Sequence, residues 1–351
     1  MSSHTLPVGD APTVYIIHDN PEWIPPFTEA LDRLGVPHIE WLLPQTSIDL
    51  TAAPPPGLFW SRLSASAHTR TDPHVKEYGR AVLEWLSGAG RPVINGRNVY
   101  ELEVSKVRQH RALTEHGFDA PRTSAVFGAD ALPAAARAFT PPFITKHNQG
   151  GKGLGVRRFD SHAELDAAAA DFAPEGANAP IDGITLVQEY VQPAEPFVTR
   201  AEFIGGRFHY AVRVDVSDGS FELCPAEACE IPGPGGAGAT TEAGAAPTSA
   251  DAPPIAPFAL RPEITRDTPL IGRLEALLAD LGIDIAGIEF IETLDNRQVV
   301  YDINTNTNYN PAVEAAEREA GRTAAADRIA SVLAARLDAA IASVPAAAPV
   351  G

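Results

Sequence analysis

The stretch "IDIAGIEFIETLDNRQVVYDINTNTNYN", residues 283–310, contains two apolar runs rich in β-branched residues. A turn signal near Asp295 and Asn296 separates them, so the stretch predicts a β-hairpin. In this hairpin Glu289 lies opposite Asp302 on the neighbouring strand. Four asparagines then follow at every second position: Asn304, Asn306, Asn308 and Asn310. In an extended chain their amides would all project to one face.

Side-chain oxygens on adjacent strands are suited to a hard cation. Mg²⁺ takes few protein carboxylates and fills its remaining positions with water or phosphate oxygens. Asparagines at alternate positions also fit a solvated strand edge or a turn-rich loop. The presence of Glu289 and Asp302 beside them favours contacts with a metal and a substrate.

Upstream, "PPFITKHNQGGKGLGVRRF", residues 141–159, predicts a strand that ends at Lys146, a loop and a second strand. The loop glycines are Gly150, Gly151, Gly153 and Gly155. Such glycines let backbone N–H groups close around phosphate oxygens. The loop is neither a Walker motif nor a dinucleotide fingerprint, because no helix starts on it. Taken alone, it fits a flexible hairpin equally well.

A further strand is predicted by "GITLVQEYV", residues 183–191. It closes with polar side chains, namely Gln188, Glu189 and Tyr190. Next, "FVTRAEFIGGRFHYAVRV" predicts a hairpin around Gly205 and Gly206. Its two arms carry Arg200 and Arg213 among apolar residues, so we expect an anionic ligand beside these arginines.

The first hundred residues alternate between strand and helix patterns. Strands are expected within residues 13–19, 37–43, 57–63 and 91–98, and helices within 24–35 and 74–90. This order predicts a small parallel sheet whose ligand edge lies at the carboxyl ends of its strands. Another helix is expected at 101–117, and a domain boundary falls between about 98 and 123.

The segment "WSRLSASAHTR", residues 60–70, follows the third strand of this sheet. It is rich in groups that bind anions: Arg62, Ser64, Ser66, His68 and Arg70. Polar surface loops are common, but the place of this one at a carboxyl strand end favours substrate binding.

Composition narrows the choice of partner. The chain has 351 residues and a net charge of −18, which disfavours nucleic acid and anionic membrane surfaces. Its two cysteines, Cys224 and Cys229, form neither a disulfide framework nor a zinc ligand set. There is no secretory signal and no apolar run of transmembrane length, so we expect a cytoplasmic protein with a small-molecule partner.

Taken in order, these segments resemble the ATP-grasp superfamily, and within it the glutathione-synthetase and glutamate-adding peptide-ligase branch. The resemblance runs from about residue 13 to 345. It implies an α/β fold with a Rossmann-like substrate lobe at 1–100 and a two-part ATP-grasp module. The small subdomain would span 101–190 with the glycine loop, and the large one 191–345 with the metal site. Residues 231–257 match no family element and are expected to form a flexible insert.

The resemblance also implies roles for individual residues. Lys106 and Lys146 would contact the nucleotide phosphates beneath the glycine loop. The adenine would be read by Gln188, Glu189, Tyr190 and Val191, and the ribose by Glu195. Glu289, Asp302 and Asn304 would hold the metal, although the family usually has Asp at the first position and Glu at the second. The segment "TNTNYNP" replaces a glycine-containing turn that lies beside the substrate in the family.

The implied activity is ATP- and Mg²⁺-dependent ligation of a carboxylate to an amine through an acyl phosphate, with Mn²⁺ as an alternative metal. Arg213 and Arg200 would steady the transferring group, while Asn306, Asn308 and Asn310 would contact the substrates. A homodimer is a candidate assembly. Two alternatives stay open: a small-molecule kinase on the same fold, and a nucleotide-binding protein without catalysis.

Overall fold

The structure is a computed structural model that describes residues 4–5, 12–44, 46–70, 72–151, 153, 155–216 and 258–342. Three sheets of four, four and five strands make up most of the molecule. A short parallel pair, β1 (His4–Thr5) with β4 (Thr46–Ser47), lies beside them. The expected flexible insert at 231–257, together with Cys224 and Cys229, falls outside the described residues.

The N-terminal sheet is parallel throughout, as its sequence pattern predicts. Its strands, in spatial order, are β3 (His38–Leu42), β2 (Thr13–His18), β5 (Gly57–Arg62) and β6 (Val93–Ile94). All six residues of β2 are buried, because helices cover both faces of this central strand. These helices are α1 (Pro25–Arg33), α2 (Val75–Gly88) and α3 (Arg97–Glu103), with short 3₁₀ turns at Pro21–Trp23 and Ala67–Thr69.

The helix expected at 101–117 is wrong as a single element. The chain forms α3 and then a separate helix, α4 (Lys106–Glu115). Ser105 interrupts them with an extended backbone (φ −143°), and its hydroxyl accepts the N–H of Arg108 as an N-cap. The break sets Lys106 at the first position of a helix that faces the later sheets.

The second sheet is antiparallel, in the order β7 (Thr123–Phe127), β10 (Ile184–Glu189), β8 (Phe143–His147) and β9 (Arg157–Phe159). The helices α5 (Leu132–Ala136) and α6 (His162–Ala168) and the 3₁₀ turns at Ala129–Ala131 and Ala169–Phe172 pack with this sheet around one small core. The glycine-rich segment connects β8 to β9.

The third sheet is also antiparallel, in the order β13 (Phe258–Leu260), β12 (Arg207–Asp215), β11 (Phe197–Ile204), β14 (Ile285–Glu292) and β15 (Gln298–Asn304). The two predicted hairpins are confirmed as β11–β12 and β14–β15. Their turns use positive φ at Gly205, Gly206 and Asn296, as tight hairpin turns require. One core joins this sheet to α7 (Pro269–Leu281) and to residues of α3 and α4.

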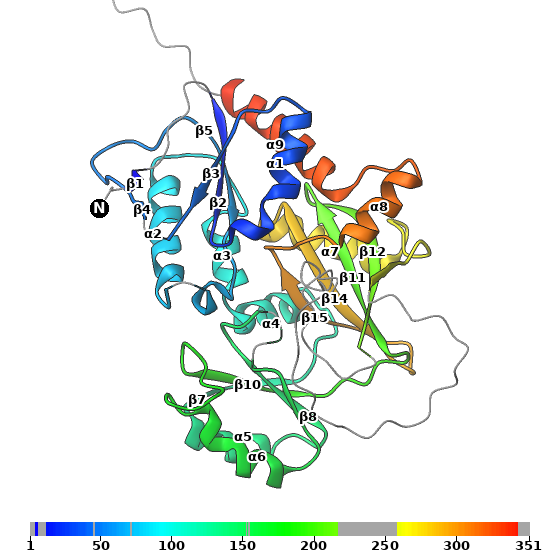
Figure 1. The fold of residues 1–351 in the computed structure, drawn as a ribbon. Coiled ribbons are helices and arrows are strands. Elements are labelled where there is room, and N and C mark those ends of the chain that lie inside the picture. The colour runs from blue at the N-terminus through cyan, green and yellow to red at the C-terminus, as the bar shows by residue number, and fades with distance from the viewer. Residues whose placement is uncertain are drawn as a thin grey trace, which may run out of the picture.

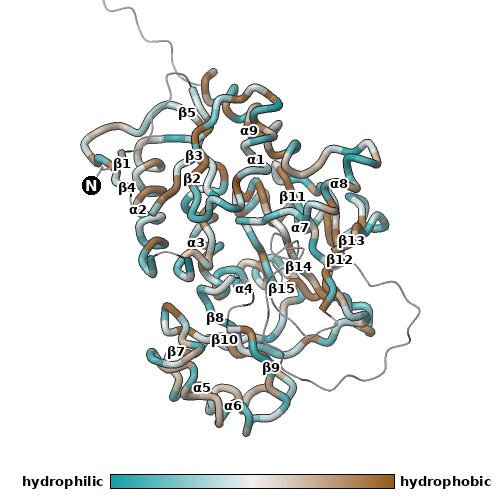
Figure 2. Tube along the Cα trace, viewed as in Figure 1, coloured by the Kyte–Doolittle hydropathy of each residue, from teal (hydrophilic) through white to brown (hydrophobic). Residues whose placement is uncertain are grey.

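The end of the described chain returns to its beginning. After α8 (Pro311–Glu319), helix α9 (Ala325–Ala342) packs on α1, β5 and β2 of the N-terminal sheet (Figure 1). Residues of α9, β2 and β12 thereby share one core. Figure 2 shows hydrophobic segments gathered on the strands and the helices that cover them. Among the described helices we find none with the length and apolarity needed to cross a membrane.

Candidate active site

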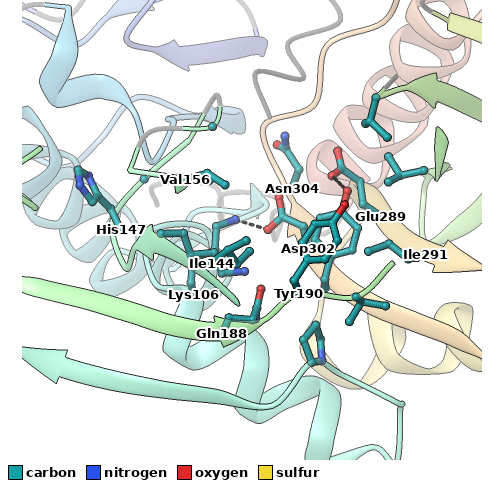
Figure 3. Close-up of a pocket in the computed structure, with 18 of the residues that line it drawn as sticks. Lys106, Ile144, His147, Val156, Gln188, Tyr190, Glu289, Ile291, Asp302 and Asn304 are labelled. Carbon is teal, nitrogen blue, oxygen red and sulfur yellow. Dashed lines mark hydrogen bonds and ion pairs between the residues drawn. The ribbon is translucent and has the colours of Figure 1, made fainter. Parts of the chain in front are cut away.

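A cavity lies between the second and third sheets, and residues from both sheets and from α4 line it. Apolar side chains form part of its lining: Ile144, Val156, Val191, Val198, Val216 and Ile291. Charged and amide side chains also line it, and we refer to them together as the polar end: Glu103, Lys106, Lys146, Glu289, Asp302 and Asn304. Figure 3 shows the ion pair between Lys106 and Asp302 inside this cavity. The arrangement suits a ligand with a flat apolar part and a highly charged part.

The pKa values of the two lysines, Lys106 and Lys146, shift in opposite directions. Burial alone would lower the pKa of Lys106, but its ion pair with Asp302 outweighs burial and raises it. Burial lowers the pKa of Lys146 to about 8, because the charge of Asp302 only partly offsets the loss of water. Burial also acts against the charged form of Asp302, yet Lys106 and Lys146 together lower its pKa. Asp302 therefore lies between two lysines and is ionised at neutral pH.

Glu289 and Asp302 lie opposite each other on β14 and β15, as predicted. The Glu289 carboxylate accepts the Tyr301 hydroxyl at 2.7 Å and the guanidinium of Arg200 at 2.9 Å. A carboxylate has about four lone-pair positions, so it keeps capacity for a cation. Asn304 adds an amide oxygen, which accepts the N–H of Asn306 at 3.2 Å.

These three residues fit a magnesium ion that is shared with phosphates. In the described part of the chain there is no group of three or more His, Cys, Asp or Glu able to hold a metal. Two carboxylates and one amide are therefore a sparse set, and a sparse set is what Mg²⁺ uses when a nucleotide supplies its other oxygens. The polar end thus fits a metal–nucleotide complex better than a free metal ion.

The glycine loop borders the same cavity. Gly150, Gly151 and Gly153 line it. Gly153 and Gly155 have φ near +75°, a conformation that favours glycine. A Cβ on Gly155 would lie 2.1 Å from the His147 ring, so glycine is required there. Lys152 and Leu154 lie outside the described residues.

The segment expected to read an adenine also lines the cavity, through Gln188, Glu189, Tyr190 and Val191. Two of these side chains are held by β7 and the residue before it. Gln188 donates to the Thr123 hydroxyl at 2.7 Å, and Glu189 accepts the Arg122 N–H at 2.9 Å. Glu195, the expected ribose ligand, is exposed and is not among the lining residues, whereas Pro193 is. Its ribose role stays a prediction.

The two arginines of the β11–β12 hairpin lie on opposite faces of the sheet. Arg200 pairs with Val212 and Glu289, whereas Arg213 pairs with Thr199 and Ala259. Paired residues share a face and neighbours along a strand alternate, so Arg213 points away from Glu289. This register contradicts the expectation that Arg213 lies beside the metal residues.

Arg200 lies on the expected face, but its neighbours differ from the expectation. We expected a ligand anion, and the structure shows carboxylates of the protein. The guanidinium donates to Glu202, Glu289 and the Thr307 hydroxyl, at 2.6, 2.9 and 2.5 Å. Sequence could not reveal this, since the register of β11 against β14 brings the three groups together.

The predicted substrate loop of the N-terminal lobe is an ordered network. Asp19, which follows β2, accepts the backbone N–H of Ser64 at 2.6 Å and pairs with Arg70. Arg70 also donates to the hydroxyls of Ser64 and Ser66. Burial raises the pKa of Asp19, although Arg70 opposes the shift. Asp19 was not predicted from the sequence, although its place at a carboxyl strand end was the available signal.

His68 contacts a lysine that the sequence analysis also overlooked. Its Nδ1 lies 3.1 Å from Nζ of Lys76, which is 2% exposed. Burial, helped by the charge of Lys76, lowers the pKa of His68 to about 4. Burial likewise lowers the pKa of Lys76 to about 8. His68 is therefore neutral at pH 7.

Arg62 joins the N-terminal lobe to the asparagine-rich turn. It donates to the carbonyl of Thr307 and to the side-chain oxygen of Asn308, both at 2.6 Å. Its guanidinium also stacks over Phe27 and Trp60, and burial lowers its pKa to about 10. Arg62 therefore positions the turn, and a contact with substrate stays a prediction.

The asparagines do not form the expected row on one face. Strand β15 ends at Asn304, and the chain beyond it is irregular. Asn310 is the N-cap of α8, where its side chain accepts the N–H groups of Ala312 and Val313. Asn306 is buried, and neither atom of its amide has a hydrogen-bond partner among the described residues. Both amide atoms of Asn306 are therefore available to a ligand.

Glu103 of α3 also holds the asparagine-rich turn. Its carboxylate accepts the N–H and the hydroxyl of Thr305 and the N–H of Ala65. Glu103 lies at the end of α3 and lines the cavity. The substrate loop, the turn and the cavity are thus adjacent. No sequence pattern that we considered singled out Glu103.

The arrangement of the three sheets is that of ATP-grasp proteins of known structure, so the chain has the ATP-grasp fold. It is similar to a RimK domain ATP-grasp protein from Sphaerobacter thermophilus DSM 20745, with a TM-score of 0.59 and 16% identity, covering 92% of this chain and 99% of that one. D-cycloserine synthetase DcsG gives a TM-score of 0.60 at 17% identity, covering 93% and 99%. The ligase PsnB, solved with a minimal precursor, Mg and ADP, gives 0.58 at 16%, covering 95% and 100%.

Sequence comparison points to the same group. A probable alpha-L-glutamate ligase of Xanthomonas campestris pv. campestris (strain 8004) is 30% identical over 150 residues, which are 42% of this chain and 49% of that protein. Its counterpart in Xanthomonas oryzae pv. oryzae (strain MAFF 311018) is 29% identical over 150 residues, or 42% and 48%. The matched segment thus spans about half the length of these curated relatives. No family model matches the chain.

Proposed function

We propose that the protein is an ATP-dependent carboxylate–amine ligase that forms an amide bond and releases ADP and phosphate. One observation carries the proposal: a single cavity is lined by apolar side chains, by Lys106 and Lys146 and by the Glu289–Asp302 pair. Apolar walls suit an adenine, and lysines beside a carboxylate pair suit phosphates that share Mg²⁺. The names of the similar proteins, which include a glutamate ligase and D-cycloserine synthetase, support amide formation over other uses of ATP.

In this proposal the adenine lies against the apolar side chains of the cavity. The walls from β8, β11 and β14 sandwich it, and backbone groups of residues 188–191 bind its edge. The phosphates extend towards Lys106 and Lys146, and the glycine loop supplies N–H donors above them. Mg²⁺, or Mn²⁺ in its place, would be held by Glu289, Asp302 and Asn304 and would neutralise charge on the phosphates.

The reaction has two steps. A carboxylate oxygen of the donor bonds to the γ-phosphorus as the bond to the ADP oxygen breaks, which gives an acyl phosphate. The nitrogen of a neutral amine then bonds to the acyl carbon, phosphate leaves, and the amine loses a proton to solvent. No protein nucleophile is needed. Lys106 and Lys146 bind the phosphates through both steps, so catalysis rests on positioning and charge.

We place the organic substrates between the cavity and the N-terminal lobe. Ser64, Ser66, His68, Arg70 and Asn306 are the side chains proposed to contact them. PsnB was solved with precursor peptides, which supports a carboxylate or amine carried by an amino acid or a peptide. We further propose a substrate lobe at 1–100, nucleotide subdomains at 101–190 and 191–345, a cytoplasmic location and a homodimer as the assembly to test.

The proposal is tested by product analysis. Purified protein, Mg²⁺ and γ-labelled ATP are incubated with candidate carboxylates and amines, offered singly and in pairs. We expect equal amounts of ADP and orthophosphate only when a donor and an acceptor are both present. With hydroxylamine in place of the acceptor, a hydroxamate should form, because hydroxylamine traps acyl phosphates.

The control is the variant Asp302→Asn, which should lose turnover. A stable phosphorylated product that keeps the label, with neither orthophosphate nor hydroxamate, would identify a kinase instead. Binding of ATP without turnover under every pairing would favour a nucleotide-binding protein without catalysis.

A further inference from the structure

The guanidinium of Arg200 lies flat over Gly287. A Cβ on Gly287 would lie 2.6 Å from two of the guanidinium nitrogens, so no other residue leaves room for it. From this position Arg200 donates to two buried carboxylates, Glu202 on its own strand and Glu289 on the neighbouring one. Arg200 is 1% exposed. Its acceptors are Glu202, Glu289 and the Thr307 hydroxyl, so Arg200 is joined to the proposed cation site through Glu289.

Thr307 links this cluster to the turn that follows β15. Its hydroxyl accepts a hydrogen bond from Arg200 and donates one to Glu202 at 3.0 Å. Its carbonyl accepts the guanidinium of Arg62 from the N-terminal lobe. Thr307 is fully buried, at 0% exposed. One threonine therefore connects the substrate lobe to the side chain proposed to bind the metal.

We propose that Thr307 is a positioning residue of the cation site, which it controls through Arg200 and Glu289. The inference rests on the proposed function, since it takes Glu289 as a metal ligand. Glu289 stands where the resemblance implies an Asp. Glu has one more rotatable bond than Asp, so a Glu metal ligand needs more neighbouring groups to orient it. Arg200 fixes one oxygen of Glu289 and Tyr301 fixes the other. Thr307 in turn holds Arg200, so a continuous chain of hydrogen bonds joins the turn at 305–308 to Glu289 of the cation site.

The experiment measures ADP binding by calorimetry, with Mg²⁺ varied and without Mg²⁺. Thr307→Val keeps the shape of the side chain and removes its hydroxyl, whereas Thr307→Ser keeps the hydroxyl. We expect Thr307→Val to raise the Mg²⁺ concentration needed for half-maximal tightening of ADP binding by about 10-fold or more. Affinity for ADP without Mg²⁺ should stay unchanged, and Thr307→Ser should behave as wild type.

Thr46→Val is the matched control for lost stability. It makes the same substitution and removes a hydroxyl that donates to the carbonyl of Leu43 at 2.7 Å. Thr46 belongs to β4, outside the Arg200 cluster, so the Mg²⁺ midpoint should not move. Gly287→Ala is a second, independent perturbation, since its Cβ displaces the guanidinium. It should raise the midpoint as Thr307→Val does.

An unchanged midpoint in folded Thr307→Val would overturn the inference, and so would an equal shift in Thr46→Val. If Thr307→Val does not fold, Gly287→Ala decides by the same measurement. Failure of both to fold would show that the cluster is needed for the fold itself, which contradicts a specific role at the cation site. If the wild type itself shows no Mg²⁺-dependent ADP binding, the proposed function fails instead.

Discussion

Replacing Lys146 or Lys106 of the cavity by methionine should change the free energy of unfolding in opposite directions. Both replacements should weaken nucleotide binding. The pKa of Lys146 falls from 10.5 to about 8. That shift corresponds to a cost of about 3 kcal/mol for keeping the charged form at pH 7, at roughly 1.4 kcal/mol per pKa unit. Methionine has a similar length and carries no charge, so Lys146→Met should raise the free energy of unfolding of the ligand-free protein by about 1–3 kcal/mol.

Lys106→Met should have the opposite effect on stability. Lys106 is the ion-pair partner of Asp302, and its removal leaves that buried carboxylate with only the charge of Lys146 nearby. Breaking one half of a buried pair costs about 3–5 kcal/mol. The nearby charge of Lys146 reduces this loss, so we expect a fall of about 2–3 kcal/mol.

Both variants should nevertheless bind ATP more weakly. A hydrogen bond to a charged group contributes about 1.5–3 kcal/mol, so the Kd should rise by about 10- to 100-fold in each. Urea unfolding without ligand gives the stabilities, and calorimetry with MgATP gives the affinities. A stabilised Lys146→Met with wild-type affinity for ATP would refute the assignment of Lys146 to the phosphates. Destabilisation by both variants would refute the electrostatic argument.

Three further predictions test other parts of the molecule. Asn304→Ala should abolish turnover while the free energy of unfolding falls by less than about 2 kcal/mol, because its amide oxygen holds only the Asn306 N–H; a fully active variant would remove Asn304 from the metal site. Arg62→Ala should lower the free energy of unfolding by about 3 kcal/mol or more, since it removes the hydrogen bonds from the N-terminal lobe to Thr307 and Asn308. A wild-type urea midpoint would contradict this. Finally, although burial opposes it, hydrogen bonds from Arg266, the Phe208 N–H and Arg207 lower the pKa of Glu275 from 4.5 to about 2. That stabilisation should be present above pH 4.5 and be lost as the pH falls towards 2. The free energy of unfolding of wild type should therefore exceed that of Glu275→Gln by about 1 kcal/mol at pH 7 and by less at pH 3. The difference is small because both arginines are largely exposed. A constant difference would contradict it.

Elements with a strong local pattern were predictable. The strand at 13–18 is a continuous apolar run, and such a run suits a central parallel strand buried on both faces. The pairing of Glu289 with Asp302 was predicted from a turn near Asp295 and Asn296, and in the structure a bulge between Glu289 and Phe290 completes the register that brings the two residues opposite. Lys146 and the glycine loop were found because a strand and its loop are adjacent in sequence.

Contacts between elements far apart in the chain were not predictable. Arg200 and Glu202 meet Glu289 and Thr307 only because β11 pairs with β14, and nothing in either segment specifies that register. Arg213 was misplaced for a local reason, because a bulge between Glu202 and Phe203 shifts the register of the β11–β12 hairpin by one residue and turns Arg213 to the other face. Other errors were avoidable. Asn310 precedes a proline and a helical pattern, and this is the ordinary signature of an N-cap.

The asparagine-rich turn shows why a spacing of two is weak evidence beyond the end of a strand. Alternation places side chains on one face only while the backbone stays extended, and β15 ends at Asn304. Beyond that residue the turn is shaped by Glu103, Arg62 and Arg200, which hold Thr305, Asn308 and Thr307 respectively. Three separate parts of the chain therefore determine which amide is left over, and it is that of Asn306. The Asn306 amide has no partner among the described residues, and it follows Thr305, which Glu103 of the cavity lining holds. A buried polar group without a partner costs about 1–3 kcal/mol. A ligand that presents both a donor and an acceptor to Asn306 would recover it, which makes this position the first place to look for the organic substrate.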